Sequence, residues 1–242
     1  MAIATNRAEP TSPSFYFFMT LVMAAIVVAG FGPTYTSALA PPGLPFWVHL
    51  HGAAMVSWIV LFAAQSWLVS HKRVPLHRWI GGFGMGLAAA IVPLGLATTA
   101  LAVRRGAVPP FLSPPQMLSI DILDVVTFAS LVSAAYFLRR KSEWHKRLLL
   151  CATILLMTPA LGRILPNTVF APAALLVGYL VMILLVGVGA ARDAFSRRAV
   201  HPAYWLGAGA ITLVQITIPL LAQSAIMSEI VAALVASRDA MP

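Results

Sequence analysis

A few ionisable residues stand inside otherwise apolar stretches of this chain, and they are its candidates for chemistry. Where the surroundings are hydrocarbon, an ionisable side chain is costly, so it faces the protein interior and meets a partner or a ligand. The candidates form two groups by their expected depth. One group is His51, Asp121, Asp124 and Arg163, and the other is centred on His77 and His145.

The first group combines an imidazole with two carboxylates. Asp121 and Asp124 are three residues apart, which places both on one face of a helix. His51 is expected at a similar depth on another helix. One imidazole and two carboxylates can hold a divalent metal such as zinc. A metal there would activate water, as in a metal-dependent membrane hydrolase.

Arg163 gives the same carboxylates two other interpretations. It is expected about one turn from the outer end of its helix, within reach of Asp121 or Asp124. An ion pair between them would hold two helices together without a metal. The same residues would also suit the proton- or ion-coupled site of a transporter or assembly factor that has no cofactor. The sequence leaves these interpretations open.

The second group pairs two histidines, each of which begins an apolar stretch on the same side of the chain. Imidazoles on facing helices can ligate haem iron from both sides, so His77 and His145 are candidate ligands of haem b. Neighbouring cations suit the haem propionates, and they are Arg78, Lys146 and Arg147.

Small residues follow the first of these histidines at helical spacing. Gly81 and Gly84 lie four and seven residues beyond His77 and leave one strip of the helix smooth. A flat macrocycle can lie against such a strip, and so can a closely packed neighbouring helix. Both interpretations are retained.

The composition of the chain indicates lipid as its solvent. Of its 242 residues, 60% are hydrophobic and 10% are charged, whereas a soluble domain has about 25% charged residues. The net charge of +9 arises from short basic runs between apolar stretches, a pattern of membrane loops rather than of nucleic-acid binding. The only cysteine, Cys151, excludes an intrachain disulfide.

The sequence therefore predicts an all-α polytopic transmembrane bundle of about seven helices. A helix crosses the bilayer with about 20 apolar residues, and backbone groups must pair within it. The expected spans are Phe15–Phe31, Phe46–Val69, His77–Val103, Gln116–Leu138, His145–Leu165, Pro172–Ala191 and Ala203–Ala222. Residues 1–14 form a cytoplasmic tail, 15–224 the transmembrane domain and 225–242 an outer segment.

The basic residues predict the orientation of these spans. Twelve of the 16 Lys and Arg residues lie in the N-terminal tail or on its side of the membrane. The N-terminus is therefore expected inside and the C-terminus outside, as in a multi-pass protein of a bacterial inner membrane. Residues Ala38–Ala40 look like a signal-peptidase site. The preceding span is longer than the usual signal core of about 7–15 residues, so we expect it to be retained.

Residues 46–166 resemble a group of uncharacterised bacterial polytopic membrane proteins. The similar stretches are "HLHGAAMVSWIVLFAAQSWLVSHKRVPLHRWIGG" and "EWHKRLLLCATILLMTPALGRILP". The matching positions are His51, Gln65, His77, Arg78, Gly81, His145 and Arg163. The pattern is also similar to small membrane cytochromes b and haem-handling oxidase-assembly proteins. That resemblance implies bound haem and a redox or assembly partner in the membrane. The chain departs from those cytochromes at its outer side, where histidine is on one helix alone, so a second, outer haem is not expected.

Three functions are thus consistent with the sequence. A haem-binding protein for electron transfer or haem handling comes first, followed by the metal-dependent hydrolase and the transporter or assembly factor. The lipid bilayer is the expected surroundings in each case. The sequence does not decide whether the chain is an enzyme, nor its oligomeric state.

Overall fold

A computed structural model describes residues 14–36, 45–165 and 173–239 of the chain. All regular secondary structure in these residues is helical, and seven segments are long and apolar enough to cross a membrane. The predicted all-α fold and the predicted number of spans are therefore confirmed. The signal-peptidase-like residues Ala38–Ala40 lie outside the described residues.

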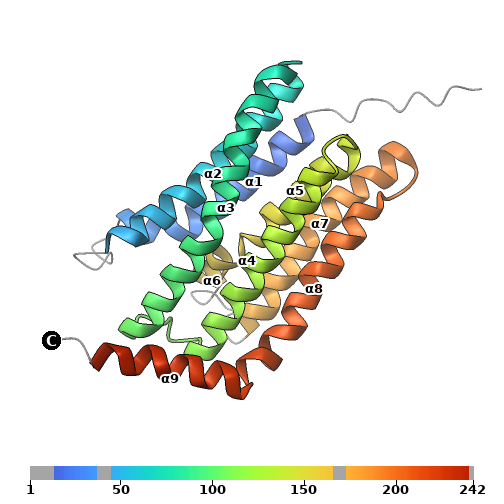
Figure 1. Ribbon diagram of the computed structural model, residues 1–242. Helices are drawn as coiled ribbons and strands as arrows, with labels where there is room; N and C mark the ends of the chain where they lie inside the picture. Colours follow the sequence, from blue (N-terminus) through green and yellow to red (C-terminus); the bar gives the residue numbers. More distant parts are fainter. Residues whose placement is uncertain (1–13, 37–44, 166–172, 240–242) are drawn as a thin grey trace, which may run out of the picture.

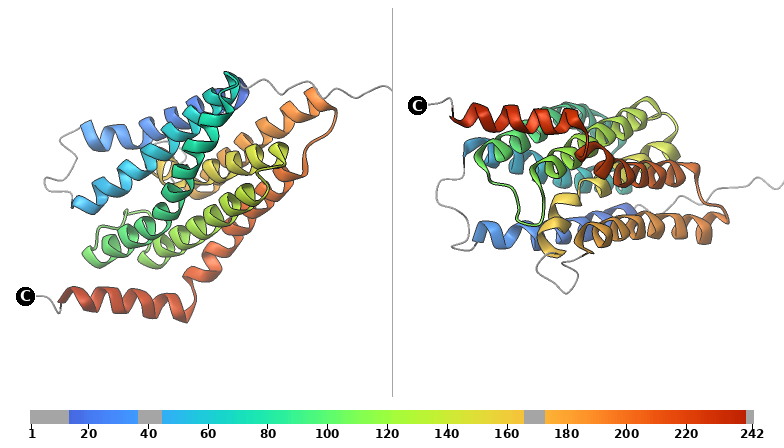
Figure 2. Two further views of the ribbon diagram at one scale, coloured as in Figure 1. Left: turned by 45° about the horizontal axis from the view of Figure 1, so that its top comes forward. Right: turned by 90° about the horizontal axis from the view of Figure 1, so that it is seen from below.

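The spans run side by side as a helical bundle (Figure 1; Figure 2). In chain order they are α1 (Ser14–Thr36), α2 (Phe46–Ser70), α3 (Val74–Arg105), α4 (Pro114–Phe137), α5 (Ser142–Leu155) with α6 (Thr158–Ile164), α7 (Ala174–Arg197) and α8 (Pro202–Ala222). The fifth span is thus divided into two helices, which the sequence did not predict.

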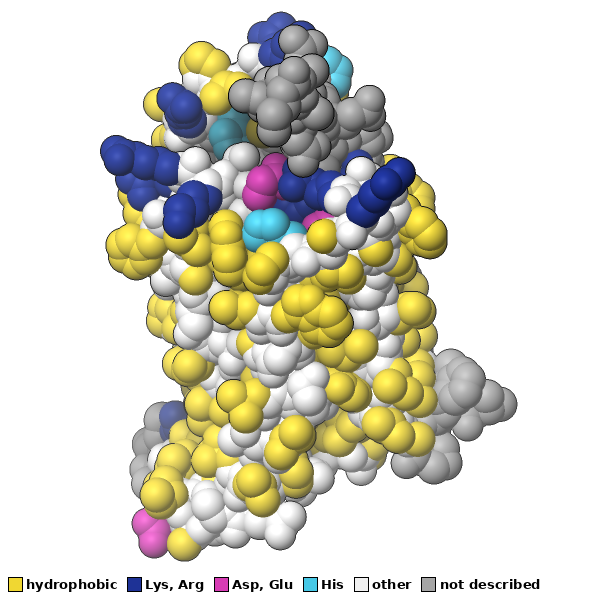
Figure 3. All heavy atoms as spheres, turned by 90° about the vertical axis from the view of Figure 1, so that its right-hand side faces the viewer, with side chains coloured by type: hydrophobic (Ala, Val, Ile, Leu, Met, Phe, Trp, Pro, Cys, Tyr) yellow, Lys and Arg dark blue, Asp and Glu magenta, His cyan; other side chains and the backbone are white. Residues whose placement is uncertain are grey.

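Three hairpins turn at the same end of the bundle, at residues 71–73, 138–141 and 198–201 (Figure 1). We call this end the basic end, because each turn carries Lys or Arg. Figure 3 shows these cations gathered at one end, above a wall of hydrophobic and uncharged side chains. A charged end and an apolar wall are the surface of a protein whose middle meets lipid.

The fifth span forms the centre of the bundle. In its most apolar window 67% of the residues are buried, whereas no other span exceeds 39%. Leu148, Leu150 and Ile154 of α5 are fully buried. Polar groups on this span therefore meet protein rather than lipid, and each needs a partner among the surrounding helices.

The C-terminal segment forms a separate helix, α9 (Ala225–Asp239), which crosses the ends of α3 and α4 away from the basic end (Figure 1). Met227 is buried against Val103 and Leu118. The Arg104 guanidinium donates to the Ser237 carbonyl at 2.9 Å. Residues 225–239 therefore cover that end of the bundle and do not extend α8.

The α1 and α6 helices approach each other at the level of their backbones. A Cβ atom at Gly30 would lie 2.6 Å from the carbonyl oxygen of Ala160 and 2.8 Å from its Cα. Glycine is the residue that this contact admits, because the obstructing atoms belong to the backbone.

We expect Gly30→Ala to lower the melting temperature of the detergent-solubilised protein. Alanine favours a helix over glycine by about 1 kcal/mol, so a loss of stability reports the clash with Ala160. Gly187→Ala on α7 is the matched control, because its added Cβ would meet nothing within 4 Å. Equal melting temperatures for the two variants would contradict the close contact.

Candidate functional site

Two acidic residues lie near the middle of α4. Counted from Pro114 at 1.5 Å per residue, Asp121 lies about 10 Å and Asp124 about 15 Å from the end that α9 covers. Asp124 is 6% exposed. One oxygen of each, Oδ2 of Asp121 and Oδ1 of Asp124, is buried without a hydrogen-bond partner in the described part of the chain. We call this pair, with the side chains that face it, the carboxylate site.

The helix that faces Asp124 is interrupted beside it. The α5 helix ends at Leu155 and α6 begins at Thr158. Pro159 has no N–H, so the Leu155 carbonyl lacks its helical donor. The Thr158 hydroxyl donates to that carbonyl instead, at 2.9 Å. A side chain thereby supplies the hydrogen bond that the Leu155 carbonyl lacks, as an apolar environment requires.

Thr158 also limits the hydrogen bonds that Asp124 can make. Its side chain faces Asp124, and its hydroxyl, which has a single hydrogen, lies 2.9 Å from the Leu155 carbonyl oxygen and 3.5 Å from Met182 Sδ. The hydroxyl oxygen can accept a hydrogen bond from a protonated Asp124. It cannot donate one to an ionised Asp124 while the bond to Leu155 is kept.

The α3 helix closes the other side of the carboxylate site. A Cβ at Gly95 would lie 3.6 Å from Asp121 Oδ1 and 3.1 Å from Val125. Thr99, buried one turn further along α3, faces Asp121. The site therefore combines two carboxylates on one helix with hydroxyls from two others.

The structure does not bring His51 together with these carboxylates. No group of three or more His, Cys, Asp or Glu side chains among the described residues is placed to hold a metal ion. Asp121 faces Gly95 and Thr99 of α3, whereas the charge that acts on His51 is that of Arg163. The expected ligand set of His51, Asp121 and Asp124 is thus not brought together among the described residues.

Arg163 also has partners other than those expected. Its guanidinium lies 4.2 Å from the centroid of the Phe31 ring and donates to the Pro159 carbonyl at 2.9 Å. No ion pair joins it to Asp121 or Asp124, all three being described residues. The reason is that α6, which carries Arg163, packs against α1.

The histidines of the second group do face each other near the basic end. The ring centroids of His77 and His145 are 6.4 Å apart and the ring planes are at 89°. With metal–imidazole bonds of about 2 Å, two imidazoles on opposite sides of one metal have centroids roughly 6 Å apart.

Nδ1 of His145 lies 2.9 Å from the Ala135 carbonyl oxygen. A neutral ring that donates there has its lone pair on Nε2. Arg78 is exposed next to His77.

The glycine strip beyond His77 packs against α2. A Cβ at Gly84 would lie 2.9 Å from a methyl carbon of Leu61, and one at Gly81 would lie 3.4 Å from Gln65 Nε2. Gln65 also donates to the His77 carbonyl at 3.2 Å. A macrocycle placed along this strip would have to displace the Leu61 side chain.

Sequence reasoning missed a buried ion-pair network near the basic end. Arg147 is fully buried. It donates to both carboxylate oxygens of Asp193, at 2.6 and 2.8 Å, and to Glu143 Oε2 at 2.6 Å. Glu143 also pairs with Arg197 at 2.5 Å and with Lys146 at 2.7 Å. A fully buried cation is thereby neutralised by two carboxylates.

The network includes the start of α8. The backbone N–H of His201 donates to Asp193 Oδ2 at 3.3 Å, and His201 Nδ1 accepts from the Ala203 N–H at 3.2 Å. Burial, with a smaller effect of the Arg147 charge, lowers the pKa of His201, which favours the neutral ring that such an acceptor requires. The ring of Tyr204 covers Arg147 at 5.6 Å. The network therefore fastens α5, α7 and α8 together.

Part of this network had a signal in the sequence. Glu143 and Arg147 are four residues apart, the spacing of an ion pair along a helix. Asp193 was hidden, because the span was expected to end at Ala191, whereas α7 continues to Arg197. The extra turns place the Asp193 carboxylate against α5.

Comparisons with known protein families, curated proteins and solved structures found no match for this chain. Its function is therefore inferred from the geometry of the carboxylate site and of the facing histidines.

We expect Asp193→Ala to destabilise the protein strongly, by about 3–5 kcal/mol, because it leaves the buried Arg147 without its main partner. Thermal denaturation in detergent would measure the loss. The double variant Arg147→Met/Asp193→Leu should recover much of it, because no buried charge is then unpaired. Arg140→Gln, an exposed change in the turn between α4 and α5, is the control. A single variant as stable as this control would show that the pair contributes little.

Proposed function

We propose that this chain is a multi-pass transporter of a bacterial inner membrane, in which the carboxylate site takes up and releases a proton as a solute crosses. The observation that carries this proposal is that Asp124 Oδ1 is buried at mid-span without a hydrogen-bond partner among the described residues. An ionised carboxylate without a cation costs several kcal/mol in such surroundings. A proton removes the charge and gives Asp124 a hydrogen bond to make, to the oxygen of Thr158.

The interrupted span supports a transport role. In many transporters, discontinuous helices place ion and substrate sites near the middle of the bilayer. Here the interruption between Leu155 and Thr158 lies beside Asp124. A tilt of α6 relative to α5 would move Thr158 and so change the hydrogen bonding of the carboxyl group. Proton binding and helix movement are then coupled through one contact.

A proton fits this site better than a metal ion does. A proton needs one acceptor oxygen, whereas a metal ion needs several ligands in a fixed arrangement. Within the described residues the site offers two carboxylates, and no third His, Cys, Asp or Glu side chain joins them.

We expect Asp124→Asn to abolish a pH-dependent signal of a protonated carboxylic acid. Infrared difference spectra of the full chain in lipid vesicles, recorded between acidic and alkaline pH, would measure its carbonyl stretch. Asparagine keeps the size of aspartate and cannot titrate. Glu229→Gln is the control, because Glu229 is exposed on α9 outside the bundle.

Transport is measured on the same preparations. Vesicles that hold the wild-type protein are placed in a defined mixture of amino acids, sugars and organic acids with an imposed pH gradient. They should accumulate a solute that Asp124→Asn vesicles do not accumulate above protein-free vesicles. An unchanged infrared signal in Asp124→Asn, or undiminished uptake, would refute the proposal.

A second candidate function is haem b binding for electron transfer or haem handling, with a redox or assembly partner in the membrane. The facing rings of His77 and His145 support it, because their 6.4 Å separation and perpendicular planes suit ligation of one iron from both sides. Arg78 would then serve a propionate. The iron would supply one-electron chemistry. The position of Leu61 argues against haem binding, because its side chain fills the space over Gly84 that the macrocycle would need.

If haem is bound, the protein purified from haem-replete cells should show a Soret band that His77→Ala removes. The absorbance spectrum of the detergent-solubilised protein measures it, together with an iron assay. His71→Ala is the control, because His71 is exposed at the end of α2, where it stacks on Trp67. A colourless wild-type preparation would contradict haem binding and would leave the transport proposal unaffected.

A further inference from the structure

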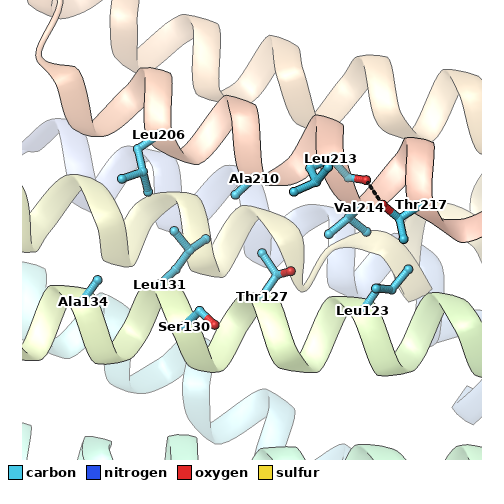
Figure 4. A pocket seen from close by; sticks show the side chains of 10 residues that line it. All are labelled: Leu123, Thr127, Ser130, Leu131, Ala134, Leu206, Ala210, Leu213, Val214 and Thr217. Atoms are coloured by element: carbon cyan, nitrogen blue, oxygen red, sulfur yellow. Dashed lines mark hydrogen bonds between the residues drawn. The ribbon is translucent and has the colours of Figure 1, made fainter.

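A groove of about 520 Å³ runs between α4 and α8 on the apolar wall of the bundle (Figure 4). Most of its lining side chains are aliphatic. The hydroxyls of Ser130 and Thr217 donate to carbonyls one turn back on their own helices, at 2.8 Å each. These two hydroxyls therefore have no free hydrogen for a ligand. With the Thr127 hydroxyl as the third polar group of the lining, the groove is mostly apolar.

The length of this groove matches the thickness of one leaflet of a bilayer. On α4 its lining runs from Leu123 to Ala134, and on α8 from Leu206 to Thr217. Each stretch advances eleven residues, or about 16 Å along a helix. Half of the hydrocarbon core is about 15 Å thick. On α4 the lining ends about one turn before Phe137, and on α8 it begins about one turn after Pro202. The groove therefore starts about 5 Å from the basic end, reaches the middle of both helices, and has the length of a single acyl chain.

Exposed cations stand where the groove meets the basic end. The turn that follows α4 carries Arg139, Arg140 and Lys141, and the turn that precedes α8 carries Arg198, and all four are exposed. The Arg139 guanidinium is held against Tyr136, 4.3 Å from the ring centroid and 3.0 Å from the carbonyl oxygen.

The nearby acid does not neutralise these cations. Glu143 begins the next helix, and its two oxygens are already shared among Lys146, Arg147 and Arg197. The end of the groove therefore keeps a positive charge, which attracts an anionic headgroup.

We propose that the groove binds one acyl chain of an anionic phospholipid, whose phosphate lies at the turn that carries Arg139 and Lys141. The apolar length selects a lipid chain, and the cations select the charge of its headgroup. This site is separate from the carboxylate site, and its occupancy depends on neither the proton nor the haem proposal.

Native mass spectrometry of the full chain tests the site. The detergent-solubilised protein is incubated with phosphatidylglycerol or with phosphatidylcholine of identical acyl chains, and the bound fraction is measured. The wild-type protein should retain more phosphatidylglycerol. Ala210→Phe should lower this retention, because the ring fills the groove. Gly209→Phe is the matched control, since Gly209 does not line the groove and a Cβ there meets nothing within 4 Å.

The charge contribution is tested separately with Arg139→Gln/Lys141→Gln. Phosphatidylglycerol binding should weaken by about fivefold for each cation removed, and phosphatidylcholine binding should not change. Arg73→Gln, in the turn between α2 and α3 of the same basic end, is the control. Equal retention of the two lipids by the wild-type protein would overturn the proposal. Undiminished binding by Ala210→Phe would overturn it too, as would a protein dimer that this variant alone disrupts.

Discussion

An ionisable side chain in hydrocarbon must be neutralised within the protein, and this bundle does so in two ways. Arg147, fully buried, meets both oxygens of Asp193 and one of Glu143. Its charge is balanced in any state that keeps those helices together. Asp121 and Asp124 form no ion pair within the described residues, and under the proposed function a proton neutralises them. The first arrangement is structural, and the second is suited to function.

The fifth membrane span has two parts, and each part is held by different neighbouring helices. Near the basic end, Arg147 fastens α5 to α7 and, through Asp193 and His201, to the start of α8. Beyond Leu155 the backbone ladder stops, and α6 packs against α1 instead. The part that carries Thr158 is therefore held by α1 and not by the ion-pair network. Under the proposed function, this division would let one half hold the bundle while the other changes a binding site.

The sequence predicted depth well and direction around the helix axis poorly. The length of the apolar stretches sufficed for seven spans, since backbone pairing leaves few alternatives in lipid. Counting along the same stretches also placed His77 and His145 at one depth. It could not tell that Arg163 faces Phe31 while Arg147 faces Asp193, because rotation about each axis depends on which neighbour each helix meets. The interruption at Pro159 added a change of direction that regular spacing could not foresee.

The central span contributes to both the histidine pair and the carboxylate site. His145 and Arg147 are two residues apart, which is about 200° around a helix. One therefore faces His77 while the other faces Asp193. Past the interruption, Thr158 of the same span faces Asp124. The histidine pair therefore lies on the part of the span that the Arg147 network holds, whereas Thr158 lies on the part that packs against α1.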